Sequence, residues 1–533
     1  MKVCNIIDLK EKIFFLSVVS LIFCTIPNNI QISISGGFSS KLSWYFIFVG
    51  FFIGLYEYYY TWRNQRARNY SYLKLSQAFI CTFMGFTFFS LIWGLWHYPY
   101  YNQILNAPVM QFDKFPIVYQ KVTDMGIHIH QEELLAIWMI LRPIKQLMLE
   151  IIYTFGVAFL VYVWSYGKWE RFIQILVKAT FCAVGIIFVY SCFEIPYLYN
   201  NNSFFSKILI YINPIIHEVK ENGGWWPPLL WPNQLRSVFA EPSYFGIYAS
   251  FAMPWLWYQL EKTKKNKNIV YIATILSLFS FCVFMTKART AVVLFLCQIV
   301  LLVIFSCYLH KSLLKKTLII IFCSMIGFLF TNVFIGNVNF NVLNKKTTYE
   351  SQVESYLNDN LGSLQHTNQR SNRARFSMME ANFRMGLDYP ILGVGYSLRQ
   401  GYTISYLPEM AFDDDEVNLW IKNQNENGII KSGFPCLGEY TTRFAETGLM
   451  GVVLFLLPML YLLINILKVI FCHNIEIAKK QAFVFYTISF LGVLGSGIGE
   501  SLNVTYSLWI LLGLGYSMIA NTQILKNASQ NSK

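Results

Sequence analysis

Charged residues are scarce in this sequence. Asp, Glu, Lys and Arg make up only 13% of the 533 residues, whereas 55% are hydrophobic and 18% are aromatic. A soluble domain usually has about a quarter of its residues charged. The scarcity excludes an ordinary soluble protein, and repeated apolar runs of about 20 residues indicate helices that cross a membrane.

The apolar runs predict an all-α integral membrane protein with about 12 transmembrane helices. The runs cover residues 12–29, 42–62, 76–96, 146–165, 173–193, 240–259, 269–286, 290–309, 317–337, 445–470, 481–498 and 503–521. We therefore expect three parts. They are residues 1–337, with the first nine helices and outer loops at 97–143 and 194–239; a large extracytoplasmic loop at 338–443; and residues 444–533, with the last three helices and a cytoplasmic tail.

Acidic residues are fewer than basic ones, 29 against 42, and the net charge is +13. The basic residues cluster in alternate short loops, which the positive-inside bias places in the cytoplasm. Both termini then lie in the cytoplasm, the long polar loop lies outside, and the basic charge needs no nucleic-acid partner. The clusters are Arg63, Arg66 and Arg68; Lys168 and Arg171; Lys262, Lys264, Lys265 and Lys267; Lys311, Lys315 and Lys316; and Lys479 and Lys480.

Cofactor motifs are also missing. The sequence has no Walker motif, dinucleotide fingerprint or zinc-protease motif. The stretch HIHQEE, residues 128–133, lacks a firm ligand spacing, so we predict no metal site there. Most of the eleven cysteines lie inside or at the ends of apolar runs, and only Cys436 falls clearly in an outer loop. We expect no disulfide framework and neither a nucleotide nor a metal cofactor.

The loop at 338–443 is the longest polar stretch. Residues 371–387 lack Pro and predict a helix that stops before Pro390. Arg375 and Arg384 each precede a glycine with ten residues between. Guanidinium groups bind phosphate, although a solvated helix with Glu380 paired to Arg384 is the alternative. The candidate substrate-binding arginines of this loop are Arg370, Arg373 and Arg375, and Arg384 is a candidate catalytic residue.

Other candidate groups lie at the outer ends of the predicted helices. Arg236, Lys287 and Arg289 break the positive-inside pattern, so they are candidate substrate-binding residues, with head-group snorkelling as the alternative. Glu241 immediately precedes Pro242 and marks a helix N-terminus. It is a candidate general base, and complementing the helix dipole is the alternative role. Two further carboxylates have unusual placements near or within apolar runs, Glu150 and Glu500.

Four stretches resemble the O-antigen polymerase and O-antigen ligase superfamily of bacterial envelope enzymes. They are RSVFAEPSYFG (236–246), KARTA (287–291), RFSMMEANFRMGLDYPILGVGY (375–396) and FAETGLMG (444–451). The resemblance covers about residues 230–520. It implies an inverting, metal-independent glycosyl transfer from an undecaprenyl-pyrophosphate glycan at the outer side of the bacterial cytoplasmic membrane. Arg236, Arg289 and the loop arginines would bind the pyrophosphate.

The resemblance favours a polymerase over a ligase. Ligases carry a His, followed by Asn, Ser or Gln, eleven positions ahead of the first glycine in their version of GLMG, and here Leu437 and Gly438 stand there. We expect a polymerase that joins lipid-linked repeat units into a surface polysaccharide, with Arg384, Arg236 and Arg289 steadying the diphosphate. Glu241 is the first candidate base and Glu439 the alternative.

The expected partners are lipid-linked oligosaccharides, membrane lipids, a flippase and a chain-length regulator, with no nucleic acid. A ligase is one alternative function. A transporter or flippase of the same lipid-linked sugars is another, but transporters show inverted repeats, and no clear internal symmetry is present.

Overall fold

The protein is a helical membrane protein without β-strands among its described residues. The structure is a computed structural model, and it describes residues 3–63, 71–105, 115–200, 203–217, 233–309, 311–342, 370–431, 434–472 and 475–531. Within this part of the chain, eight helices are long and apolar enough to cross a membrane, and three shorter helices are also apolar. The predicted all-α membrane fold is confirmed.

A helix lies at each of the predicted apolar runs. The first differs from its prediction, because α1 ends at Val19 and a 3-10 turn, Ser20–Ile22, follows, whereas the apolar run reaches residue 29. Hydrophobicity alone does not fix where a helix ends. The helices are α1 (Val3–Val19), α2 (Leu42–Arg63), α3 (Ser71–Trp96), α6 (Gln131–Tyr153) with α7 (Phe155–Ser165), α8 (Trp169–Asn200), α10 (Pro242–Lys262), α11 (Asn266–Met285), α12 (Arg289–Leu309), α13 (Lys311–Val342), α18 (Glu439–Phe471), α19 (Ile477–Ser496) and α20 (Tyr506–Asn531).

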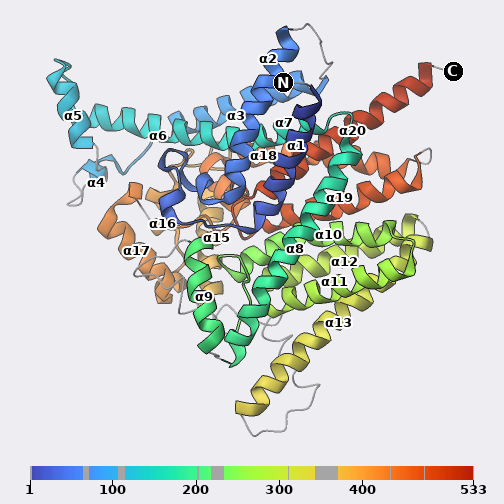
Figure 1. The fold of residues 1–533 in the computed structure, drawn as a ribbon. Coiled ribbons are helices and arrows are strands. Elements are labelled where there is room, and N and C mark those ends of the chain that lie inside the picture. The colour runs from blue at the N-terminus through green and yellow to red at the C-terminus, as the bar shows by residue number, and fades with distance from the viewer. Residues whose placement is uncertain are drawn as a thin grey trace.

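Helix α10 lies at the centre of the bundle, with α11, α12 and α19 packed around it (Figure 1). Its side chains are buried along nearly its whole length. Small residues allow this close approach, since a Cβ on Gly246 would lie 2.6 Å from the Cβ of Ala291. Gln298 of α12 donates from Nε2 to the carbonyl of Ser250 at 2.6 Å and to that of Ile488 at 3.1 Å, which ties α10, α12 and α19 together.

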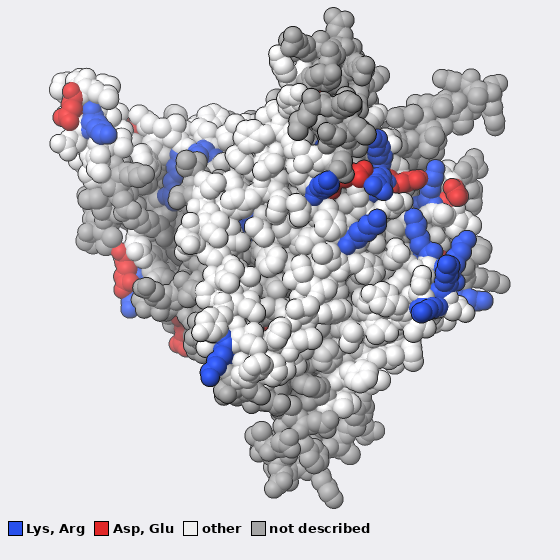
Figure 2. Space-filling model, viewed as in Figure 1, with Lys and Arg blue, Asp and Glu red and all other residues white. Residues whose placement is uncertain are grey.

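The two ends of the bundle differ in charge. The turns between α10 and α11 and between α12 and α13 meet at one end, where Lys316 Nζ donates to the carbonyl of Thr263 at 3.1 Å. Lys and Arg gather over this end, at the right of Figure 2. The opposite end carries α15 (Arg370–Asp388), α16 (Arg399–Tyr406) and α17 (Asp415–Asn427), which lie at the left of Figure 1. That this basic end faces the cytoplasm stays a prediction.

Helix α15 confirms a local prediction. It spans Arg370–Asp388 and ends before Pro390, as the absence of Pro predicts. It packs on the first turns of α18, where a Cβ on Gly386 would lie 2.2 Å from the ring of Phe444. Asn382 Nδ2 also donates to Thr442 Oγ1 at 3.4 Å. Helix α15 of the polar loop is therefore packed onto the bundle.

Helix α18 is broken at Gly448, where φ is 65° and ψ is −170°. The loop of the DYPILGVGY motif fills the break and pairs with the backbone groups that the break leaves open. The hydrogen bonds are Val394 N to Ala445 O at 2.8 Å, Gly395 N to Glu446 O at 3.1 Å and Leu449 N to Pro390 O at 2.8 Å. Ser90 Oγ of α3 adds a bond to Glu446 O at 3.1 Å and one to Leu392 O of the loop at 2.8 Å. The two motifs DYPILGVGY and FAETGLMG thus form one structural unit.

Replacing Gly448 by Ala is expected to prevent this unit from forming. The backbone angles there are open almost only to glycine, and the added Cβ would lie 2.4 Å from the carbonyl carbon and oxygen of Ile391. The expected cost is roughly 2–5 kcal/mol. Size-exclusion chromatography of the detergent-solubilised protein should show loss of the monodisperse peak. Gly185→Ala in α8, where a Cβ meets nothing within 4 Å, is the matched control, and equal peaks for both variants would contradict the expectation.

Candidate active site

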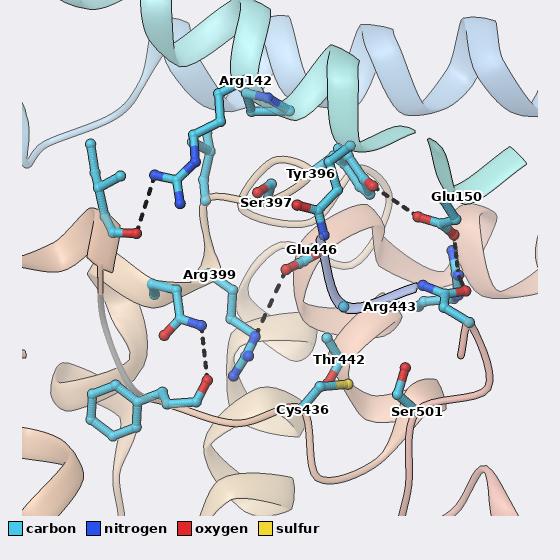
Figure 3. Close-up of a pocket in the computed structure, with 18 of the residues that line it drawn as sticks. Arg142, Glu150, Tyr396, Ser397, Arg399, Cys436, Thr442, Arg443, Glu446 and Ser501 are labelled. Atoms are coloured by element: carbon cyan, nitrogen blue, oxygen red, sulfur yellow. Dashed lines mark hydrogen bonds and ion pairs between the residues drawn. The ribbon is translucent and has the colours of Figure 1, made fainter. Parts of the chain in front are cut away.

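A cavity of about 460 Å³ lies at the end of the bundle that carries α15 to α17. Its walls come from α6, the chain after DYPILGVGY, residues 429–436, the first turns of α18 and the turn at 501–504. Figure 3 shows its polar lining. Six charged side chains face it, namely Arg142, Glu150, Arg399, Glu439, Arg443 and Glu446.

Arg443 is the buried centre of this lining. Its Nη2 lies 2.5 Å from Glu150 Oε1, and its Nε lies 2.5 Å from Glu439 Oε1. Nη2 also donates to Asn503 Oδ1 at 2.9 Å. The guanidinium carbon lies 3.9 Å from the ring centroid of Phe455, a distance typical of a cation–π contact. All three side chains of this Glu150–Arg443–Glu439 triad are at most 7% exposed.

The two carboxylates of the triad are also bonded at their second oxygens. Glu150 Oε2 accepts from the hydroxyl of Tyr396 at 2.8 Å. Glu439 Oε2 accepts from Ser501 Oγ at 3.1 Å and from the amide of Leu502 at 2.9 Å. The triad therefore braces α6, α18 and two loops around the cavity. This placement favours a bracing role for Glu439 over the alternative base role that the sequence suggests.

Glu446 is the most accessible of the three carboxylates, with 18% of its side chain exposed. Its Oε1 lies 3.8 Å from Arg399 Nε, and the backbone of Ser397 hydrogen-bonds to the carboxylate. Arg399 is only 3% exposed, and one of its remaining donors reaches Asn382 Oδ1 at 3.3 Å. Unlike Glu150 and Glu439, Glu446 is not enclosed by side-chain donors, so a substrate hydroxyl can reach it.

Arg142 supplies a further cation at the cavity. It is exposed, and its Nη1 donates to the carbonyl of Ile430 at 3.2 Å. No ion pair to Arg142 is found in the part of the chain that the structure describes. Figure 3 shows it reaching from α6 toward the cavity, above Arg399. Both guanidinium groups keep donors available for an anionic ligand.

Sequence reasoning missed Arg142, Arg399, Arg443 and Glu446. Glu446 lies inside FAETGLMG, where a carboxylate at the start of an apolar run was a usable signal. Arg399 follows DYPILGVGY by three residues but has no periodic pattern that distinguishes it from the other loop arginines. Glu150 was noted as unusual within an apolar run, and it does line the cavity.

Glu241 lies beside a second, smaller cavity of about 180 Å³ and is absent from the described lining of both cavities. Burial raises the pKa of Glu241, and the neighbouring Glu500 carboxylate raises it further. Arg375 also belongs to this neighbourhood, because its Nη1 lies 3.3 Å from Glu500 Oε1. The two cavities share three wall residues, Cys436, Ser501 and Val504.

The other arginines of α15 lie elsewhere. Arg384 is 52% exposed and forms an i,i+4 ion pair with Glu380 at 2.5 Å, the alternative arrangement that the sequence suggested. Arg373 is half-buried and also absent from the described lining of both cavities. The side chain of Arg370 lies outside the described residues. A catalytic role for Arg384 stays a prediction.

Arg236 is buried against α8. Its amide donates to Glu194 Oε1 at 3.2 Å, and its Nη1 donates to the carbonyl of Ala240 at 3.4 Å. Lys287 and Arg289 are half-buried at the turn between α11 and α12, and Lys287 has a φ of 50°. None of the three is among the described residues that line the two cavities, so their substrate-binding roles stay predictions.

The HIHQEE stretch starts a helix. His130 is the N-cap of α6, and its amide donates to Glu133 Oε2 at 3.1 Å in a capping box. Among the described residues, no group of three or more His, Cys, Asp or Glu side chains is arranged to hold a metal ion.

Comparison with known proteins identifies one family. The family model described as O-antigen ligase matches residues 273–428, which run from α11 to the end of α17 and include Arg375, Arg384 and Arg399. No curated protein matches the chain. The match covers less than a third of the chain, and over these residues this multi-helix membrane protein is similar to the O-antigen ligase family, in agreement with the resemblance that the sequence motifs indicate.

Proposed function

We propose that this protein is a polymerase that joins undecaprenyl-pyrophosphate-linked oligosaccharide repeat units into a surface polysaccharide such as O-antigen, capsule or exopolysaccharide. The observation that carries the proposal is the larger cavity, where Arg142, Arg399 and Glu446 meet at one end of an apolar helical bundle. Glycosyl transfer from a diphosphate-linked sugar requires cations to bind the diphosphate and a carboxylate to accept a proton, and this cavity contains two such cations and one accessible carboxylate. The reaction takes place at the outer face of the cytoplasmic membrane of a bacterium.

Arg142 and Arg399 bind the diphosphate of the donor. Negative charge grows on the diphosphate as its bond to the sugar breaks, and fixed guanidinium groups stabilise that charge. Arg399 is held in place by Glu446 and Asn382, so its geometry is set before the substrate arrives. The activated donor supplies the driving force, and the step uses the protein's own side chains.

Glu446 acts as the general base. It takes the proton from a hydroxyl of the acceptor sugar, whose oxygen attacks the anomeric carbon of the donor from the face opposite the diphosphate. A new carbon–oxygen bond forms, the bond to the diphosphate breaks, and the leaving diphosphate keeps the electron pair. The configuration at the anomeric carbon is inverted. Glu241, the first candidate from the sequence, lies beside the smaller cavity.

The start of α18 supports a polymerase over a ligase. Leu437 stands where ligases of the superfamily have a histidine, and it is an apolar, half-buried side chain. The next residue, Gly438, is the N-cap of α18 with a φ of 133°, and a Cβ there would lie 2.8 Å from the carbonyl oxygen of Ile498. The chain therefore has no room at this position for the Asn, Ser or Gln that follows the ligase histidine.

The test is a gel of surface glycan from cells with and without the protein, together with cells that carry Arg399→Gln. Loss of the ladder, with single repeat units left, is expected without the protein, and Arg399→Gln should reduce chain extension about 100-fold. Full-length ladders that stay on the carrier lipid would identify a ligase instead, and an unchanged pattern would overturn glycan assembly. Arg384→Ala in the same gel decides whether the exposed arginine of α15 also takes part.

A further inference from the structure

The smaller cavity has a mostly apolar wall that carries a few polar and charged side chains, and the mechanism above does not use it. It lies between the chain before α2, the start of α10 and the turn that follows α19. Its polar lining residues are Lys41, Ser43, Tyr244, Glu500, Ser501, Thr505 and Ser507. Because Cys436, Ser501 and Val504 line both cavities, the two cavities adjoin each other.

Four charged side chains from distant parts of the sequence lie at or beside this cavity: Lys41 and Glu500 line it, and Arg375 and Glu241 are neighbours of Glu500. Arg375 Nη1 lies 3.3 Å from Glu500 Oε1, and Lys41 Nζ lies 5.0 Å from the ring centroid of Tyr244. Glu241 interacts electrostatically with Glu500, Arg375 and Lys41, and its Oε2 accepts from the hydroxyl of Ser243 at 3.2 Å. Two cations and two carboxylates give a mixed set of donors and acceptors without a dominant charge.

This balance selects the kind of ligand. A diphosphate would meet the carboxylates Glu241 and Glu500, and a divalent cation would meet Lys41 and Arg375, so neither is favoured. A sugar ring has hydroxyls that donate and accept, and it pairs with both kinds of group. Burial raises the pKa of Glu500 as well as that of Glu241. Each carboxyl can then bond a hydroxyl as an acceptor or, when protonated, as a donor.

We propose that the smaller cavity, with Lys41, Tyr244 and Glu500 in its lining, binds the terminal sugar of the acceptor oligosaccharide and presents its hydroxyl past Ser501 to the larger cavity. The assignment rests on the proposed glycosyl transfer and adds to it a separate subsite for the acceptor. Its volume of about 180 Å³, against about 460 Å³ for the larger cavity, suits one sugar residue. The acceptor and the donor diphosphate are thus recognised by different side chains.

The experiment measures binding of two probes separately to the purified full-length protein. One probe is undecaprenyl diphosphate, and the other is the lipid-free repeat oligosaccharide released by mild acid from the host's own surface polymer. Saturation-transfer NMR follows the oligosaccharide, and calorimetry follows the lipid. Glu500→Gln and Tyr244→Phe should each weaken oligosaccharide binding at least about 10-fold and leave diphosphate binding unchanged, because the first replaces a charged acceptor by a neutral amide and the second removes a hydroxyl.

Arg399→Gln should show the reverse pattern and weaken only diphosphate binding. Glu426→Gln, which removes an exposed carboxylate paired with Lys422 on α17, is the matched control and should change neither. Wild-type oligosaccharide affinity in both Glu500→Gln and Tyr244→Phe would overturn the acceptor subsite while the transfer proposal stands. A wild-type protein that binds the diphosphate but not the oligosaccharide would overturn it in the same way, whereas binding of neither probe would overturn both proposals.

Discussion

Glu446→Gln is expected to lower the rate of chain extension about 10²–10⁴-fold while the protein stays folded and still binds the donor. The amide has the size of the carboxylate and can accept the same backbone hydrogen bond from Ser397, but it cannot take a proton. Donor binding should persist because Arg142 and Arg399 are intact. The rate is measured with purified protein and lipid-linked repeat units, as the time course of ladder growth.

Two further variants complete this test. Glu446→Asp keeps the carboxylate and should restore part of the rate, which a purely structural role would not predict. Glu426→Gln on α17 is the matched carboxylate control and should extend chains at the wild-type rate, since that side chain is 59% exposed. A rate for Glu446→Gln within threefold of wild type would mean that another residue is the general base. Glu241 would then be the first residue to replace.

Arg443→Met is expected to destabilise the folded protein by about 3–5 kcal/mol. The substitution leaves Glu150 and Glu439 buried without the cation that holds both of them, and a buried carboxylate without a partner is costly. The loss should appear as a lower temperature of half-unfolding in detergent, followed by the intrinsic fluorescence of the tryptophans. The expression yield should fall in parallel.

A surface ion pair provides the comparison for Arg443. Arg171 Nη2 lies 2.9 Å from Glu11 Oε2, but the Arg171 side chain is 54% exposed. Arg171→Met should therefore leave the temperature of half-unfolding almost unchanged, because water screens exposed pairs. Equal losses for Arg171→Met and Arg443→Met would show that burial of the triad does not determine its contribution.

Local features of the structure could be predicted from the sequence. The extent of α15 follows from helix propensity and from the restriction that Pro390 places on the residue before it. Glu150 drew notice because a charged side chain within an apolar run needs a partner, and Arg443 is that partner. In both cases the signal lies in the nearby sequence, although the identity of the partner of Glu150, 293 positions away, does not.

The choice among the loop arginines could not be predicted. Helical periodicity places Arg373, Glu380 and Arg384 on one face of α15, but it does not say what that face meets. The structure turns Arg384 outward and brings Arg399, from the next helix, into the cavity. That outcome depends on the hydrogen bonds between the DYPILGVGY loop and broken α18, which join residues about 50 positions apart in the sequence.

The break in α18 has a consequence for the order of biosynthesis. Its open backbone groups are satisfied by Val394, Gly395 and Pro390, which leave the ribosome before α18 does. Glu439 then needs Ser501 and Leu502, from the turn that precedes the last helix. A nascent chain therefore cannot complete the larger cavity until its final hairpin is in place. The larger cavity is therefore assembled late, from segments made early and late in synthesis.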